Sequence, residues 1–207
     1  MLSYLILGLG YGFAAGAQPG PFQAFLLAQA VRTGWRKTLP AVCAPLLSDG
    51  PIIAFVLLVL SSLPFWWLTV LRFAGGFFLF HLAAGTYRAW RDYHSGTDRP
   101  PTGIRHTLFR AVLVNLLNPY PYLSWSLVMG PLLVTAWHDS AGSAISLLAG
   151  FYAAVLLTLA GILLLLGGSG KLSPRISRTL LGVSGLALAV FGCYQIFEAS
   201  RAILPEW

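Results

Sequence analysis

Two long apolar segments of the chain are each interrupted near the middle by prolines. The first contains Pro19-Gly20-Pro21 within Gln-Pro-Gly-Pro, and the second contains Pro119-Tyr120-Pro121 within Asn-Pro-Tyr-Pro, about one hundred residues later. Proline removes a backbone donor and clashes with the preceding turn, so a regular helix does not continue through such a motif. In a bilayer the freed backbone groups need partners in protein or in a water-filled cavity. The two interruptions therefore predict a polar site between two broken helices.

Composition places the chain in a membrane. Of its 207 residues, 57% are hydrophobic and only 9% are charged, and the mean hydropathy is +0.75. A soluble globule needs more polar surface than this. Six apolar stretches are each long enough to cross a hydrocarbon core of about 30 Å. They cover residues 2–30, 38–60, 64–89, 107–135, 141–166 and 178–203. The sequence predicts an all-α integral membrane protein with six transmembrane helices.

The basic residues predict how these helices are oriented. Lys and Arg gather in or beside the first, third and fifth connections, at Arg32, Arg36, Lys37, Arg88, Arg91, Arg99, Arg105, Arg110, Lys171, Arg175 and Arg178. Such loops face the cytoplasm, so both termini are expected on the outer side of a bacterial inner (plasma) membrane. Because these residues orient helices, the net charge of +7 does not indicate a nucleic-acid partner.

The polar stretch from Tyr93 to Thr107 divides the chain into two halves of three spans each. We expect a single transmembrane domain over residues 1–207, with one repeat over about 1–92, a cytoplasmic loop over about 93–106 and a second repeat over about 107–207. With three spans per half, the first and fourth helices run in opposite directions, so the halves are predicted to form an inverted repeat. The first and fourth helices are also the broken ones. Sites in inverted repeats of this kind lie near the bilayer midplane.

Several motifs occur in a fixed order along the chain. They are Gln18-Pro19-Gly20-Pro21, the basic turn Arg32-Thr33-Gly34-Trp35-Arg36, Asp49, the segment Leu71-Arg72-Phe73-Ala74-Gly75-Gly76-Phe77-Phe78-Leu79, and Asn115-Leu116-Leu117-Asn118-Pro119. In this combination the chain resembles the lysine exporter (LysE) family of six-span amino-acid efflux proteins over nearly its whole length. The resemblance implies proton-driven export of amino acids or related metabolites, with no cofactor. It departs from the family at Tyr120, where Asn-Pro is commonly followed by Lys.

Asp49 lies near the centre of the second predicted span, where an acidic side chain costs roughly 2.5 to 3.5 kcal/mol to insert. Such a residue is expected to exchange a proton with each transport cycle or, when ionised, to hold an ammonium group. Alternatively, Asp49 caps a helix that restarts at Gly50-Pro51. His81 lies deep in the third span and is a second candidate for proton coupling, through a contact with Asp49. Its alternative is a neutral imidazole bonded to a neighbouring helix.

The substrate is expected to bind where the two broken helices meet. The predicted binding residues are Gln18, Pro19, Gly20, Pro21, Asn115, Asn118, Pro119, Tyr120 and Pro121. Backbone groups exposed at the breaks can grip a zwitterion without formal protein charges. The alternative is that both motifs are kinks needed only for helix packing.

Glycines recur at every fourth residue of the first span, at Gly8, Gly12, Gly16 and Gly20. They predict a smooth face that lets a neighbouring helix approach closely, within the chain or in a homodimer. Near the end of the last span, Glu198 and Arg201 lie one turn apart and are expected to form a local ion pair.

The sequence fits two other functional classes less well. An intramembrane enzyme is suggested by Gly182-Val183-Ser184-Gly185, but no later helix offers a histidine, and Cys43 and Cys193 lie outside both broken segments. A metal-ion exporter needs a cluster of ligands, and Asp49 with one His falls short of it. We therefore predict no catalytic residue and no metal site, and the expected partners are a small-molecule substrate, protons and the lipid bilayer.

The predicted orientation can be tested by cysteine labelling. A cysteine at Gly103, in a background without Cys43 and Cys193, should stay unlabelled by a membrane-impermeant thiol reagent in intact cells and should react after permeabilisation. Labelling of this cysteine in intact cells would reverse the orientation.

Overall fold

The computed structural model describes residues 1–59, 65–92, 103–167 and 174–203, and every regular element among them is a helix. The connection at Ser61-Ser62-Leu63-Pro64, most of the central loop and the segment from Gly168 to Lys171 lie outside the described residues. Four continuous helical segments are long and apolar enough to cross a membrane, namely Trp35–Val56, Thr69–Arg91, Ala141–Leu165 and Arg175–Arg201. The chain is thus an all-α, multi-pass membrane protein.

The first half begins with a helix that is interrupted where the sequence predicts it. Its elements are α1 (Leu2–Ala17), α2 (Pro21–Thr33), α3 (Trp35–Thr38), the 3-10 helix η1 (Leu39–Cys43), α4 (Ala44–Val59) and α5 (Phe65–Arg91). The break falls at residues 18–20, where Pro19 and Pro21 leave two carbonyls of α1 without helical donors. Gly34 turns the chain between α2 and α3 with a φ of 89°, a conformation that favours glycine.

The second half begins in the same way. Its elements are α6 (Ile104–Leu116), α7 (Pro119–Ser124), the π-helix η2 (Trp125–Met129), α8 (Gly130–Asp139), α9 (Ala141–Gly167) and α10 (Pro174–Arg201). The break falls between Leu116 and Pro119, as predicted. The predicted span 107–135 therefore exists as shorter helices on either side of an interruption.

Three predicted boundaries are shifted, because charged residues are taken into helices. The second span begins at Trp35, so that Arg36 and Lys37 lie in the helix α3. Likewise α6 begins at Ile104 and includes Arg105, and α10 begins at Pro174. Long basic side chains can extend to the interface while their backbone stays helical, so a charge does not mark the end of a membrane helix.

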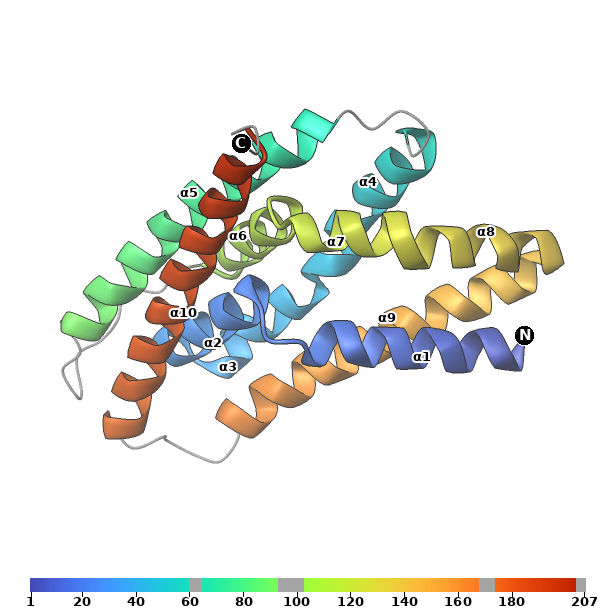
Figure 1. The fold of residues 1–207 in the computed structure, drawn as a ribbon. Coiled ribbons are helices and arrows are strands. Elements are labelled where there is room, and N and C mark those ends of the chain that lie inside the picture. The colour runs from blue at the N-terminus through green and yellow to red at the C-terminus, as the bar shows by residue number, and fades with distance from the viewer. Residues whose placement is uncertain (60–64, 93–102, 168–173, 204–207) are drawn as a thin grey trace.

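Among the described helices, the most extensive contact joins α1 to α9, which run side by side in Figure 1. Gly8, Gly12 and Gly16 are buried in this contact. A Cβ at Gly8 would overlap the carbonyl oxygen of Leu147, and one at Gly12 would overlap that of Phe151. The predicted glycine face is therefore real, and α9 of the same chain covers it.

Gly20 does not belong to that face, and this part of the prediction is wrong. The helix α1 ends at Ala17, and Gly20 is the extended residue before α2, with a φ of −161°. The four-residue spacing continues in the sequence, but residues four apart share a face only within a helix, and α1 has ended before Gly20.

The second extensive contact joins α5 to α10, again through glycine. A Cβ at Gly76 would lie 3.0 Å from the carbonyl oxygen of Gly192, and one at Gly192 would lie 3.1 Å from that of Gly76. Gly75, the residue before Gly76 in α5, lies against the carbonyl oxygen of Leu117, the residue that follows α6. These glycines let α10 and the end of α6 approach α5 closely.

The α1–α9 contact gives a test with an internal control. Gly12→Ala places a methyl group against the backbone of α9 and should destabilise the protein by about 1–3 kcal/mol, because neither backbone can yield locally. Gly10→Ala meets nothing within 4 Å and should leave stability unchanged or raise it by up to about 1 kcal/mol through helix propensity. SDS-induced unfolding in mixed micelles measures both. Equal stability of the two variants would contradict the close packing.

Candidate functional site

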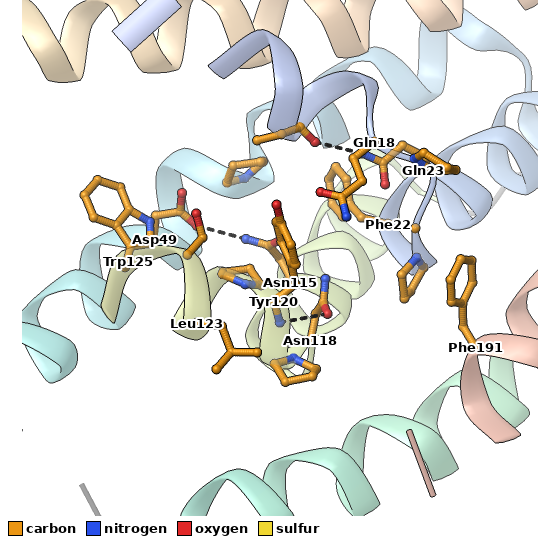
Figure 2. Close-up of a pocket in the computed structure, with 18 of the residues that line it drawn as sticks. Gln18, Phe22, Gln23, Asp49, Asn115, Asn118, Tyr120, Leu123, Trp125 and Phe191 are labelled. Atoms are coloured by element: carbon orange, nitrogen blue, oxygen red, sulfur yellow. Dashed lines mark hydrogen bonds between the residues drawn. The ribbon is translucent and has the colours of Figure 1, made fainter. Parts of the chain in front are cut away.

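A pocket of about 340 Å³ lies between the two interrupted helices (Figure 2). This volume is within the usual range of small-molecule sites, about 300–1,000 Å³. The structure brings the predicted residues of both motifs to this one pocket, together with Asp49. They are Gln18, Pro19, Gly20, Pro21, Asn115, Asn118, Pro119, Tyr120 and Pro121.

Side-chain hydrogen bonds close the break between α1 and α2. Pro19 has no N–H to offer the carbonyl of Ala15, and the Gln23 amide nitrogen of α2 donates to it at 3.3 Å instead. The same nitrogen donates to the Gly16 carbonyl at 3.2 Å. Gln23 therefore fastens the second half-helix to the end of the first.

The break between α6 and α7 is closed in an equivalent way. The Asn118 side-chain oxygen accepts from the backbone N–H of Tyr120 at 3.2 Å and so caps α7. The carbonyl of Leu116 accepts instead from the Tyr122 hydroxyl at 3.0 Å. Leu116 stands two residues before Asn118, as Gly16 stands two residues before Gln18. At both breaks, a side chain from just beyond the prolines satisfies the carbonyl at this position.

Asp49 is only 4% exposed and sits at the meeting point of four elements. The Asn115 amide nitrogen of α6 donates to its Oδ1 at 2.9 Å, and the Tyr152 hydroxyl of α9 lies 3.5 Å from its Oδ2. Figure 2 shows the Trp125 indole of η2 beside the carboxylate, as a further neutral donor next to it. Asn115 also donates to the Ser48 hydroxyl at 2.7 Å. No Lys or Arg among the described residues forms an ion pair with Asp49.

The alternative in which Asp49 caps a restarting helix is wrong. The helix α4 runs without interruption from Ala44 to Val59 and contains Pro51. The missing N–H of Pro51 frees the carbonyl of Leu47, four residues earlier. A membrane helix tolerates a proline in its interior where neighbouring groups accommodate it. The carboxylate of Asp49 accepts side-chain donors from other elements instead.

The structure does not bring His81 to Asp49. His81 is exposed on α5, where its ring stacks on Phe78 with centroids 6.5 Å apart, and it does not line the pocket. Helix geometry explains this position. Nine residues separate His81 from Arg72, which does line the pocket, and nine residues turn a helix by about two and a half turns, to the opposite face.

The charged residues Arg72 and Glu198 of the pocket wall were not among the predicted site residues. The Arg72 guanidinium lies 3.7 Å from the Glu198 carboxylate, and both side chains line the pocket. The predicted pairing of Glu198 with Arg201 is wrong, because Arg201 instead lies over the Phe197 ring, 5.8 Å from its centroid. The sequence signal that could have identified Arg72 is its position: it lies well inside the apolar stretch 64–89, whereas Arg88 lies at the end of that stretch.

The features weighed for other functions lie outside the pocket. Cys43 and Cys193 are exposed, and Ser184 is buried within α10, away from the pocket-lining residues. In the part of the chain that the structure describes, no group of three or more His, Cys, Asp and Glu side chains is placed to hold a metal ion.

A comparison with protein-family models decides the family. The model of the LysE type translocator matches residues 13–199. The chain belongs to the LysE type translocator family. The match covers both helix breaks and the charged pair, and it confirms the resemblance seen in the motifs. The LysE family is a family of membrane transporters rather than enzymes. Searches of curated proteins and of solved structures gave no match.

The closure of the second break can be tested at Tyr122. Tyr122→Phe keeps the ring that packs edge-on against Phe55 but leaves the Leu116 carbonyl without its donor. We expect a loss of about 1 kcal/mol in the free energy of unfolding, measured by SDS titration in mixed micelles. Tyr87→Phe is the control, because Tyr87 is exposed and stacks on Trp90. If both variants keep wild-type stability, the hydrogen bond from Tyr122 to Leu116 does not stabilise the protein.

Proposed function

We propose that this LysE-family transporter is a secondary active exporter of amino acids or related small metabolites, driven by the proton gradient. The substrate binds near the bilayer midplane, in the pocket between the α1–α2 and α6–α7 breaks. The observation that carries the proposal is that both proline motifs, far apart in sequence, line one pocket of small-molecule size.

The helix contacts support six spans arranged as an inverted repeat. In such a repeat, α1 corresponds to α6, and α2 corresponds to the segment from α7 to α8. The segment from α3 to α4 then corresponds to α9, and α5 corresponds to α10. The contact of α1 with α9 then has a symmetric counterpart in the contact of α6 with α4 and η1. The contact of α5 with α10 joins two corresponding helices, so it is its own counterpart. We infer one domain over residues 1–207 with its repeats over about 1–92 and 107–207, in a bacterial inner membrane with both termini outside.

The pocket suits a small polar solute. Gln18 and Asn118 stand at equivalent places in the two motifs, and both line the cavity. Asn118 uses its side-chain oxygen to cap α7, which leaves its amide nitrogen as a donor toward the pocket. The walls between these polar groups are largely apolar and include Phe22, Phe191 and Leu159. A few convergent polar groups in an apolar cavity are typical of sites for small metabolites.

Asp49 is the group we assign to proton coupling. It lines the pocket, and it is held by the neutral donors Asn115, Tyr152 and Trp125. A buried carboxylate without a fixed cationic partner can gain or lose a proton as its surroundings change. The backbone N–H of Asn118 donates to the carbonyl of Asn115 at 3.2 Å, so the same short segment of chain contacts both Asp49 and the break. This link offers a route by which occupancy of the pocket changes the proton affinity of Asp49.

Transport in proteoliposomes tests the proposal. Wild-type protein should accumulate amino acids in response to an imposed pH gradient and should not transport divalent cations. Asp49→Asn keeps the shape of the side chain and can accept a similar hydrogen bond from Asn115. It should still exchange amino acids down their gradient while losing pH-driven accumulation, because the group that carries the proton is gone.

Two other outcomes are informative. An Asn variant with an unchanged pH-driven rate would remove Asp49 from the coupling step. Transport of divalent cations without amino-acid transport would replace the proposed substrate class. His81→Phe serves as the matched control, since this titratable residue of the same membrane region lies outside the pocket and should keep its pH-driven rate.

A further inference from the structure

We propose that Arg72 recognises the carboxylate of the transported molecule and that Glu198 neutralises Arg72 while the pocket is empty. This inference deepens the proposed function and rests on it. It assigns substrate selection to a pair of charged residues that lies apart from the two proline motifs and from Asp49.

The first observation is the placement of the pair. The two side chains come from α5 and α10, and 19% of Arg72 and 26% of Glu198 remain exposed, although both helices are packed tightly together. Gly76, one turn after Arg72, lies against Gly192 at the crossing of these helices. Both charged residues line the pocket. The crossing therefore holds a cation and its counter-ion at the wall of the cavity.

The second observation is how loosely the pair is held. The Arg72 nitrogen lies 3.7 Å from the Glu198 oxygen, whereas a charge-assisted hydrogen bond spans about 2.7–2.9 Å. By comparison, Arg91 bonds the exposed Asp92 at 2.9 Å. Among the described residues, no acceptor takes a hydrogen bond from the Arg72 guanidinium. Its donors thus remain available to an incoming acceptor, and a guanidinium suits a carboxylate best, with two parallel hydrogen bonds.

The third observation is that the charges of the pocket are unequal. Among the described residues that line it, Arg72 is the only basic one, while Asp49 and Glu198 are acidic. Asp49 is occupied by Asn115, Tyr152 and Trp125. An anionic group in this cavity therefore has one cation to bind, and Glu198 is already beside that cation. Glu198 competes with the substrate, so an unloaded pocket does not leave an unpaired cation in the membrane.

Binding of amino acids and of their carboxamides to the purified protein tests this assignment. The probes are the twenty common L-amino acids and the matching amides, such as L-leucine and L-leucinamide, and affinity is obtained from thermal stabilisation over a concentration series. Wild-type protein should bind an acid about 10- to 100-fold more tightly than its amide, the range expected for a buried charge-assisted hydrogen bond. Arg72→Gln should abolish this preference, and Arg72→Lys should keep part of it.

Glu198→Gln separates recognition from mere structural support. Because it removes the competing carboxylate, it should bind acids more tightly than the wild type does, whereas a pair with a purely structural role would weaken binding from either side. Arg201→Gln is the matched control: it removes a positive charge from the same end of α10, where Arg201 contacts Phe197 and does not line the pocket. It should leave the acid-to-amide ratio unchanged.

The assignment and the proposed function fail in different ways. If amino acids bind the wild type and Arg72→Gln keeps the preference for acids, Arg72 is not the recognition residue, while the exporter proposal stands. Weaker acid binding in both Arg72→Gln and Glu198→Gln would reduce the pair to a structural contact. If none of the twenty amino acids binds the wild-type protein, the proposed substrate class and this assignment are both overturned.

Discussion

A membrane gives an unpaired backbone group no water to bond, and the centre of this protein is built around that constraint. The prolines at the two breaks free carbonyls that a continuous helix would satisfy. Gln23 and Tyr122 take over this task from the far side of each break. The helices can therefore stop and restart, and residues of both breaks line one pocket.

Close helix packing fixes the position of that pocket. The half-helix α1 is held along α9 by glycines that leave no room for a Cβ, and α5 is held against α10 at Gly76 and Gly192. Gly75 also receives the Leu117 carbonyl at the end of α6. These contacts depend on shape, because hydrocarbon tails are as apolar as leucine and give helices no hydrophobic reason to associate. The α1–α9 contact supports the first broken helix, and the α5–α10 contact brings Arg72 and Glu198 to the pocket wall.

The pocket separates its polar tasks in space. Asp49 lies among neutral donors and forms no ion pair with the described residues, which is suited to exchanging a proton. Arg72 and Glu198 form a loose pair on other helices, which is suited to binding a charged group of the substrate. Asn115 connects the first of these sites to the α6–α7 break. In the function we propose, substrate and proton bind to different residues of one pocket.

The sequence alone determined the membrane class, both helix breaks and the position of Asp49 within an apolar helix, because these depend on local covalent geometry and on the composition of each segment. Only the tertiary structure decided which side chains meet. It paired Glu198 with Arg72, 126 positions away, rather than with its neighbour Arg201, and it turned His81 away from the pocket. Spacing along one helix fixes which residues share a face, but the crossing of two helices fixes what that face contacts.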